Sequence, residues 1–243
     1  MRNPRIYQPM PISVGDHLQL DEKGSHHVGK VLRMQAGQAV RLFNGEGGEY
    51  QATIMAVDKK NVLVDIESFS EADHLSPLPV HLGQVISRGE RMDYALQKAV
   101  ELGVSEITPL YSMRCEVKLS GSRLEKRMQQ WQHLIISACE QCGLNRLPEI
   151  HPPKVALQWF ADADASLKWL LHPGQTPLKL FIEKEPPESV CLAIGPEGGF
   201  DDSEVAAAKA AGFQAVAIGP RVLRTETAPI AALSLLQFQW GDF

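Results

Sequence analysis

Two glycine-proline turns near the carboxyl terminus contain the residues best suited to bind a ligand or to do chemistry. The first turn begins at Gly195 and continues into Glu197, and the second begins at Gly219 and continues into Arg224. A short apolar run with β-branched residues precedes each turn, which predicts a buried strand of a parallel sheet. A single turn of this kind only ends a strand, whereas two such strand ends side by side form a crevice where α/β sheets bind ligands.

The first turn suits a cationic or neutral ligand better than a phosphate. Glu197 and the pair Asp201 and Asp202 place negative charge where a phosphate would lie at the start of the following helix. The glycines allow a flat base to lie directly on the backbone. The sequence has neither a GxGxxG motif after the first strand of this region nor a Walker motif, which argues against a Rossmann or P-loop nucleotide site.

An alternation of strands and helices begins at Val80 and predicts an α/β domain with a mainly parallel sheet. The expected strands cover residues 80–86, 106–111, 168–171, 190–194 and 215–218, and the expected helices cover 89–100, 122–142, 202–211 and the segment that ends near 239. Asp201 followed by Glu204 predicts a capping box, and Thr225 or Thr227 can cap the last helix. Gly143 is the expected end of the longest helix.

Residues 1–70 predict a small β-rich unit, because apolar and polar residues alternate at period two in three runs. A glycine-rich turn at 44–48 joins the first two runs as a hairpin. A helical segment over 26–34 precedes them and places Lys30 and Arg33 on one face. The polar, proline-containing stretch 71–79 predicts a linker. We therefore expect two domains, at residues 1–71 and 72–243.

The composition predicts a soluble, cytoplasmic protein. The chain has 243 residues, of which 44% are hydrophobic, and no apolar run is long enough to span a membrane. The amino terminus lacks the apolar segment of a signal peptide. A net charge of −5 argues against a nonspecific nucleic-acid binder and leaves room for a specific one with a local basic face.

The four cysteines predict buried thiols in a reducing compartment and no metal site. Cys139 and Cys142 form a single CxxC pair inside a helical pattern, and the chain has no second pair at zinc-finger spacing. Cys115 and Cys191 lie far from that pair in sequence. A redox role is disfavoured as well, because no thioredoxin-like βαβ pattern surrounds the pair.

Four segments resemble the motifs of a known family. They are IGPEGGF, IGPRVLRTETA, RGERMDYALQKAVELGV and CEQCGLNRLPEI. The likeness extends over nearly the whole chain, from RNPRIY at the start to WGDF at the end. In combination they resemble the RsmE-type ribosomal RNA uridine-N3 methyltransferases of the SPOUT superfamily. The resemblance implies a parallel sheet with a carboxyl-terminal deep trefoil knot, preceded by a PUA-like β-barrel that binds RNA. It also implies a homodimer and S-adenosylmethionine as the methyl donor.

The same resemblance implies which residues hold the cofactor. Backbone groups on the ends of three strands would contact its adenosine and methionine parts. These residues are Leu171, His172, Ile194, Gly195, Gly199, Ile218, Gly219, Leu223 and Arg224. The reaction implied is methylation at N3 of uridine 1498 in 16S ribosomal RNA, on naked RNA or on the assembled 30S subunit.

Uridine N3 carries a proton at neutral pH, so the enzyme needs a base and a group that stabilises the resulting anion. Glu197, Glu226 and Glu140 are candidate bases, and Glu197 has the alternative of only holding its turn or pairing with an arginine. Arg224 and Arg114 are candidate stabilisers.

Arginines and lysines at the ends of predicted elements are candidates for RNA binding, although scattered basic residues are usually just solvated. The candidates are Arg2, Arg5, Lys30, Arg33, Arg88 and Arg146. Two rival functions stay open. One is a SPOUT methyltransferase that acts at another RNA position, such as the ribose 2′-O. The other is a non-catalytic RNA-binding protein, against which the glycines at 195, 199 and 219 argue.

Overall fold

The computed structural model describes residues 3–178 and 185–243, which divide into two compact units. Unit 1 combines Met1–Leu75 with Ile136–Leu147, and unit 2 combines Ser76–Ile135 with Pro148–Phe243. The chain therefore leaves unit 1 in the polar stretch 71–79 and returns to it for one segment in the middle of the sequence. No helix among the described residues combines the length and the apolar character needed to cross a membrane.

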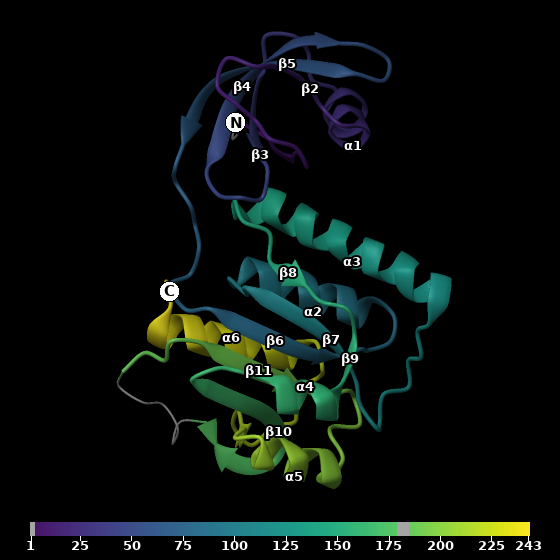
Figure 1. The fold of residues 1–243 in the computed structure, drawn as a ribbon, viewed down its shortest axis with the longest axis vertical. Coiled ribbons are helices and arrows are strands. Elements are labelled where there is room, and N and C mark those ends of the chain that lie inside the picture. The colour runs from purple at the N-terminus through teal and green to yellow at the C-terminus, as the bar shows by residue number, and fades with distance from the viewer. Residues whose placement is uncertain (1–2, 179–184) are drawn as a thin grey trace. The chain divides into compact units, whose positions relative to one another are not determined.

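Unit 1 is built on a five-stranded sheet in the order β1-β3-β4-β5-β2 (Figure 1). Its strands are β1 (Arg5–Tyr7), β2 (His17–Gln19), β3 (Ala39–Phe43), β4 (Glu49–Val57) and β5 (Val62–Ser70). β1 pairs parallel with β3, and the other pairs are antiparallel. The period-two alternation predicted from the sequence is confirmed: the apolar residues at alternate positions of β3, β4 and β5 form the core, namely Val40, Leu42, Ala52, Ile54, Val62, Val64 and Ile66.

The helical segment of unit 1 begins earlier and ends earlier than the sequence predicted. α1 (Glu22–His26) starts at Glu22 because the Asp21 side chain accepts a hydrogen bond from the Gly24 amide at 2.7 Å. It continues into the π-helix η1 (His27–Val31). Arg33 lies beyond that end with a φ of 52°, so the expected common helix face with Lys30 is wrong.

The sheet of unit 2 is parallel in every described pair, as the sequence predicted, and has the order β12-β10-β11-β6-β7-β8. Its strands are β6 (Val80–Val85), β7 (Glu106–Tyr111), β8 (Glu149–Ile150), β9 (Lys154–Val155), β10 (Leu167–Pro177), β11 (Val190–Ile194) and β12 (Gln214–Ala217). β9 also pairs with β7.

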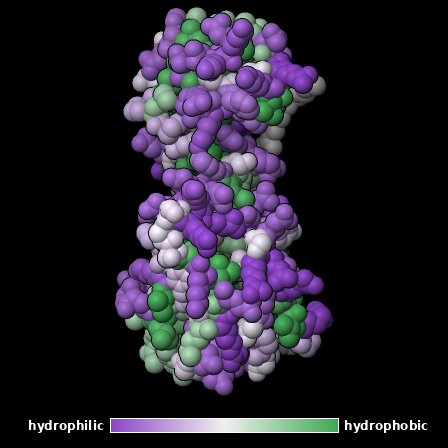
Figure 2. Space-filling model, turned by 90° about the vertical axis from the view of Figure 1, so that its right-hand side faces the viewer, coloured by the Kyte–Doolittle hydropathy of each residue, from purple (hydrophilic) through white to green (hydrophobic). Residues whose placement is uncertain are grey.

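Helices cover the two faces of this sheet (Figure 1). They are α2 (Glu90–Glu101), α4 (Ala156–Asp162), α5 (Asp202–Ala210) and α6 (Thr227–Trp240). α3 (Gly121–Cys142) lies against α2, where Trp131 donates to Asp93, and its last residues belong to unit 1. α2 packs against α6, and α4 packs against α5. The central strand β11 is buried along its whole length, because Cys191 and Ala193 pack in the core that contains Trp159 of α4 and Phe200. On the face drawn in Figure 2, hydrophilic side chains predominate and hydrophobic residues form separate patches.

Two of the predicted helix ends are confirmed, and one is wrong. Asp201 and Glu204 form the predicted capping box of α5. Gly143 follows the last residue of α3 with a φ of 102°, as expected for a terminating glycine. The predicted threonine cap of α6 is wrong: Glu226 holds the cap position without a side-chain hydrogen bond, and the Thr225 hydroxyl is used elsewhere.

Strand β10 continues past the expected end at residue 171. Its pairing with β11 does stop at Leu171, opposite Ile194. On its other side, Val216 of β12 is the partner of Leu171 and again of Thr176, so residues 172–175 are an insertion between the two pairings. His172 therefore lies in a bulge of the pairing between β10 and the edge strand β12, and not in a loop that ends β10.

Candidate functional site

The carboxyl ends of β10, β11 and β12 lie side by side, as the sequence predicted for its two turns. Leu171 pairs with Ile194 on one side and with Val216 on the other. The segments 171–172, 194–199 and 218–224 consequently start at the same edge of the sheet. Among the predicted cofactor-binding residues, Ile194 is buried, while Gly219 and Arg224 are exposed. The other residues of this set are half-buried: Leu171, His172, Gly195, Gly199, Ile218 and Leu223.

Three glycines shape this edge of the sheet, whose segments 171–172, 194–199 and 218–224 we call the cradle. Gly199 and Gly219 each have a φ of 69°, a conformation that favours glycine. A Cβ on Gly195 would lie 3.2 Å from the Phe200 backbone nitrogen, so a side chain there would crowd the turn. A Cβ on Gly219 would meet nothing within 4 Å, which leaves open space over this backbone.

A buried threonine links the last loop to the middle of the sheet. The Thr225 hydroxyl donates to the Gly195 carbonyl oxygen at 2.9 Å and accepts from Gln84 Nε2 at 3.1 Å. Thr225 is 5% exposed and Gln84 is fully buried. This link was not predicted from the sequence, although a glutamine inside the apolar run of β6 is a detectable signal, because buried amides need partners. The link holds the segment that carries Arg224 at the edge of the sheet.

A pocket of about 820 Å³ adjoins the cradle and is lined by the segments that follow β6, β7 and β11. We call it the arginine pocket, because Arg88, Arg91 and Arg114 line it together with Glu197 and Gly198. β11 is paired with β10 on one side and with β6 on the other. The turn after β11 therefore contributes to the cradle and to the arginine pocket at once.

The arginines of this pocket are held by hydrogen bonds and ion pairs. Arg114 donates to the Gly198 carbonyl oxygen at 3.0 Å and pairs with Asp201 at 3.1 Å. Arg91 pairs with Glu197 at 2.7 Å. A third pair joins Arg88 and Glu116 at 2.8 Å. Each of the three guanidinium groups is thus paired with a carboxylate, and Arg91 and Arg114 are tied to the turn that carries Glu197 and to the start of α5.

The three candidate bases lie in different places. Glu197 lines the arginine pocket. Glu226 caps α6, and its Oε2 is buried without a hydrogen-bond partner in the described part of the chain. Glu140 belongs to unit 1, where it accepts from the Tyr7 amide at 3.0 Å, and burial raises the pKa of its carboxyl group. Of the three, only Glu197 is among the residues that line the pocket.

His172 presents a buried polar atom toward the cradle region. Its Nδ1 is buried and has no hydrogen-bond partner within residues 3–178 and 185–243. A Cβ on Gly199 would lie 3.8 Å from the His172 ring, so the imidazole borders the glycine turn. Burial lowers the pKa of His172, and Asp202 acts in the opposite direction. Burial therefore favours the neutral form of the imidazole.

The predicted RNA-binding residues fall into three groups. Lys30, Arg33 and Arg88 are exposed. Arg146 is exposed and pairs with Asp73 at 2.9 Å within unit 1. Arg5 is 8% exposed, and Arg2 lies outside the described residues.

The placement of Arg5 indicates a structural role. Its guanidinium donates to the Asn145 side-chain oxygen at 2.7 Å and to the Leu144 carbonyl oxygen at 3.0 Å, and it pairs with Glu49. These partners join β1 and β4 to the segment Ile136–Leu147 inside unit 1. A buried guanidinium with these partners has little capacity left for a phosphate.

Comparison with known proteins shows which class of protein this chain belongs to. A family model described as an RNA methyltransferase domain matches residues 74–237, and a model described as an RNA methyltransferase PUA domain matches residues 20–67. Fold and sequence therefore define an RNA methyltransferase with a PUA domain.

Individual relatives narrow this class. Ribosomal RNA small subunit methyltransferase E of Buchnera aphidicola (subspecies Schizaphis graminum) is 37% identical, over 99% of this chain and 98% of its own length. The enzyme of the same name from Neisseria gonorrhoeae, solved with S-adenosyl methionine bound, is 38% identical with a TM-score of 0.92, and each chain is covered completely. A proposed methyltransferase from Legionella pneumophila, solved with the bound cofactor SAM, is 47% identical with a TM-score of 0.96 and complete coverage of both chains. The chain belongs to the ribosomal RNA small subunit methyltransferase E family.

Proposed function

We propose that this protein transfers a methyl group from S-adenosylmethionine to N3 of a uridine in small-subunit ribosomal RNA, at the position equivalent to uridine 1498 of 16S RNA. The observation that carries the proposal is the shared turn after β11. It places a glycine-lined cradle on one side and an arginine pocket of about 820 Å³ on the other. A methyl donor in the first and a nucleotide in the second would meet at this turn.

The residues of the cradle fit S-adenosylmethionine. The open space above Gly219 admits a flat base against the backbone, and the buried Nδ1 of His172 offers a polar atom without a protein partner among the described residues. Glu197 and Asp202 supply negative charge near the turn, which suits a sulfonium cation. The residues that would hold the cofactor are Leu171, His172, Ile194, Gly195, Gly199, Ile218, Gly219, Leu223 and Arg224. When bound, the cofactor supplies an electrophilic methyl group.

The pocket supplies what uridine N3 requires. We assign Glu197 as the base that takes the N3 proton on its carboxylate. The freed N3 electron pair would form the bond to the methyl carbon as the carbon–sulfur bond of the donor breaks, and S-adenosylhomocysteine would leave. The negative charge then spreads to O2 and O4 of the base, where Arg114 and Arg224 would stabilise it. Arg114 is suited to this role because its hydrogen bonds to Gly198 and Asp201 fix the guanidinium before substrate arrives. Arg91 holds the Glu197 carboxylate at 2.7 Å.

RNA binding is assigned to the amino-terminal domain, residues 1–71 with the segment Ile136–Leu147 that returns to it, and to the rim of the pocket. The rest of 72–243 forms the methyltransferase domain. Exposed Lys30 and Arg33 would contact phosphates from the first domain, together with Arg146 and Arg2. Arg88 would do so at the pocket, where it pairs with Glu116 on the surface. A ribosomal RNA substrate, free or in the 30S subunit, implies that the protein acts in the cytoplasm.

A deep trefoil knot and a homodimer complete the proposal. The last segment leaves the edge strand β12, reaches β6 and β11 through the Thr225 hydrogen bonds, and then packs as α6 against α2; this path supports a threaded carboxyl terminus. α6 is apolar around most of its circumference and leaves Leu235 and Phe238 exposed at 38% and 73%. An apolar helix of this kind is normally covered on all sides, which supports a second copy against it.

The test uses small ribosomal subunits that lack the modification. With protein and labelled S-adenosylmethionine, nucleoside digestion and mass spectrometry should recover the label as 3-methyluridine. Recovery as a 2′-O-methylated nucleoside would replace this function with ribose methylation. Calorimetric titration with S-adenosylmethionine is the companion measurement, since a non-catalytic RNA-binding protein with a lost cofactor site would give no binding heat.

A further inference from the structure

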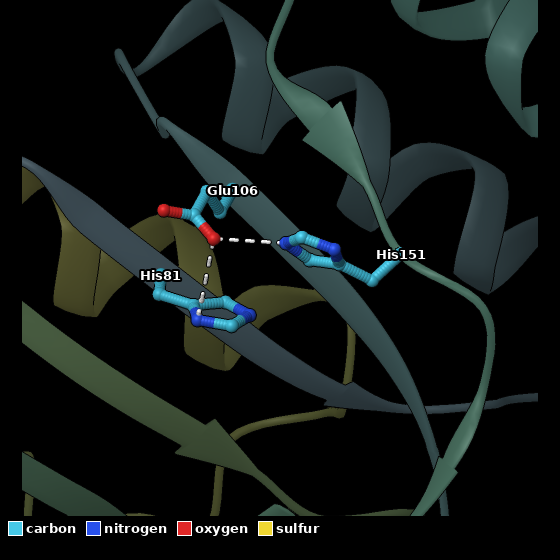
Figure 3. A group of neighbouring side chains, drawn as sticks. All are labelled: His81, Glu106 and His151. Atoms are coloured by element: carbon cyan, nitrogen blue, oxygen red, sulfur yellow. Dashed lines mark hydrogen bonds and ion pairs between the residues drawn. The ribbon is translucent and has the colours of Figure 1, made fainter. Parts of the chain in front are cut away.

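Two histidines and a glutamate converge at the amino-terminal edge of the unit 2 sheet, opposite the edge that carries the cradle. His81 in β6 is the register partner of Glu106 at the start of β7, and His151 directly follows β8. Figure 3 shows one carboxylate oxygen of Glu106 directed at both imidazole rings. That oxygen, Oε2, lies 3.7 Å from His81 Nδ1 and 2.8 Å from His151 Nε2. The ligand atoms of the three residues all lie within 4.8 Å of one another.

We propose that these three side chains bind one divalent transition-metal ion of the zinc class, through His81 Nδ1, Glu106 Oε2 and His151 Nε2. Two imidazoles and one carboxylate form an established ligand set for zinc, with water in the fourth position. Tetrahedral coordination at normal zinc distances separates the ligand atoms by about 3.4 Å. The distances from Glu106 Oε2 to the two nitrogens bracket that value, and the separation between the nitrogens is at most 4.8 Å, so the side chains would have to draw together to complete the site.

The second nitrogen of each imidazole already has the partner that a metal-bound histidine needs. His151 Nδ1 lies 3.3 Å from Glu149 Oε1, and His81 Nε2 lies 2.8 Å from Thr108 Oγ1. A protonated nitrogen that donates to such a partner leaves the lone pair of the other nitrogen for the metal. At His151, the metal would bind one ring nitrogen, and the Glu149 carboxylate would accept a hydrogen bond from the other.

A competing arrangement involves Trp159, whose indole Nε1 lies 3.4 Å from His81 Nε2. An indole nitrogen can only donate, so a strong bond there would make Nε2 an acceptor and turn Nδ1–H toward Glu106. The shorter contact of Nε2, to the Thr108 hydroxyl at 2.8 Å, allows Nε2–H to donate instead. Only the second arrangement leaves Nδ1 free to bind an ion, so a measurement of metal binding distinguishes the two.

Exposure and charge at the cluster favour a cation. The Glu106 side chain is 46% exposed and the two imidazoles are about a quarter exposed, so an ion can reach them from solvent. Glu149 adds a second negative charge, while the nearby Lys154 is neutralised in part by Asp162 at 3.0 Å. A bound ion would tie β6 and β7 to the short β8 segment. This role does not depend on methyl transfer.

Zinc titration of chelator-treated protein tests the proposal, with a chromophoric chelator as competitor. The wild type should bind one equivalent of zinc, and His151→Gln and Glu106→Gln should each weaken binding at least tenfold. Glu149→Gln should weaken it about 10- to 100-fold, as loss of an outer partner does. His26→Gln, which alters an exposed histidine of α1, should bind like the wild type.

A direct spectrum identifies the ligands. Cobalt(II) should give the visible absorption of a four-coordinate nitrogen and oxygen site in the wild type, and this absorption should vanish in His151→Gln. Circular dichroism on Glu106→Gln, which keeps the shape of the side chain, checks that the variants fold. Absence of stoichiometric binding in the wild type would overturn the proposal. Binding retained in the folded His151→Gln and Glu106→Gln variants, as expected for zinc held by the cysteines, would overturn it equally.

Discussion

Gly219 has a φ of 69° and open space where a Cβ would stand, and Gly212 shares these properties with a φ of 88°. Only Gly219 lies in the cradle, so the two form a matched pair. Gly219→Ala and Gly212→Ala should each lose about 1 kcal/mol of unfolding free energy, because an L-residue is strained in this conformation. Only Gly219→Ala should weaken S-adenosylmethionine binding. Urea unfolding and calorimetric titration measure the two effects, and equal binding by both variants would remove Gly219 from the cofactor site.

Arg114 offers a residue-scale test of the pocket. Arg114→Ala should slow single-turnover methyl transfer about 100-fold, because it removes a preorganised donor aimed at the developing charge. The unfolding free energy should change by less than about 1 kcal/mol, since the ion pair with Asp201 is partly exposed. Arg123→Ala, at an exposed position of α3, is the control and should react at the wild-type rate. An unchanged rate in Arg114→Ala would assign the anion's stabilisation to other groups.

Individual site residues could be predicted where the local sequence alone creates the feature. Gly195 and Gly219 stand out because each interrupts an apolar run. The pair between Arg91 and Glu197 could not be predicted, because it joins the start of α2 to a turn 106 positions away and depends on β11 lying beside β6. His81 was missed for the same reason: its distance from Glu106 follows from strand register, which one sequence does not reveal.

At the scale of elements, α6 carries the strongest prediction. Phe238 is 73% exposed on a helix that is otherwise mostly apolar, so Phe238→Asp should convert a dimer into monomers by placing a charge in the shared surface. Sedimentation velocity measures the mass. Leu157→Asp, at a 44% exposed position of α4, is the control and should remain dimeric. A wild-type protein that sediments as a monomer would contradict the dimer outright.

Glu140 gives a pH prediction for the part of α3 that belongs to unit 1. Burial raises its pKa above the ordinary value of 4.5, against the lowering effect of the Tyr7 amide. The folded protein then holds this proton more tightly than the unfolded chain, so unfolding free energy falls as pH rises from about 4.5 through the raised pKa. Glu140→Gln should lack this fall, and Glu125→Gln, exposed on α3, should keep it. Identical pH profiles for wild type and Glu140→Gln, measured by urea unfolding, would exclude the effect.

Element boundaries were predicted best where a local signal sets them. The Asp201–Glu204 capping box fixes the start of α5 from four neighbouring residues. The extent of β10 was missed, because the pairing that resumes at Thr176 depends on its distant partner Val216 in β12. The cap of α6 was missed because tertiary structure directs the Thr225 hydroxyl to Gly195.

At the scale of the whole molecule, the change in the spacing of apolar residues along the sequence was enough to predict two architectures in one chain. Period two before residue 70 became the sheet of unit 1, and the strand–helix rhythm after residue 80 became the parallel sheet of unit 2. The return of Ile136–Leu147 to unit 1 was not predictable, since its contacts rest on Arg5 and Asn145, which lie 140 positions apart.

Primer extension on small-subunit RNA tests the central claim most directly. Subunits from cells without the methyltransferase are incubated with the protein and S-adenosylmethionine, and the extracted RNA is reverse transcribed at high nucleotide concentration. A methyl group on N3 blocks base pairing, so we expect one new stop next to a single uridine, at the position equivalent to 1498. A full-length product without that stop, or a pause seen only at low nucleotide concentration, would contradict it.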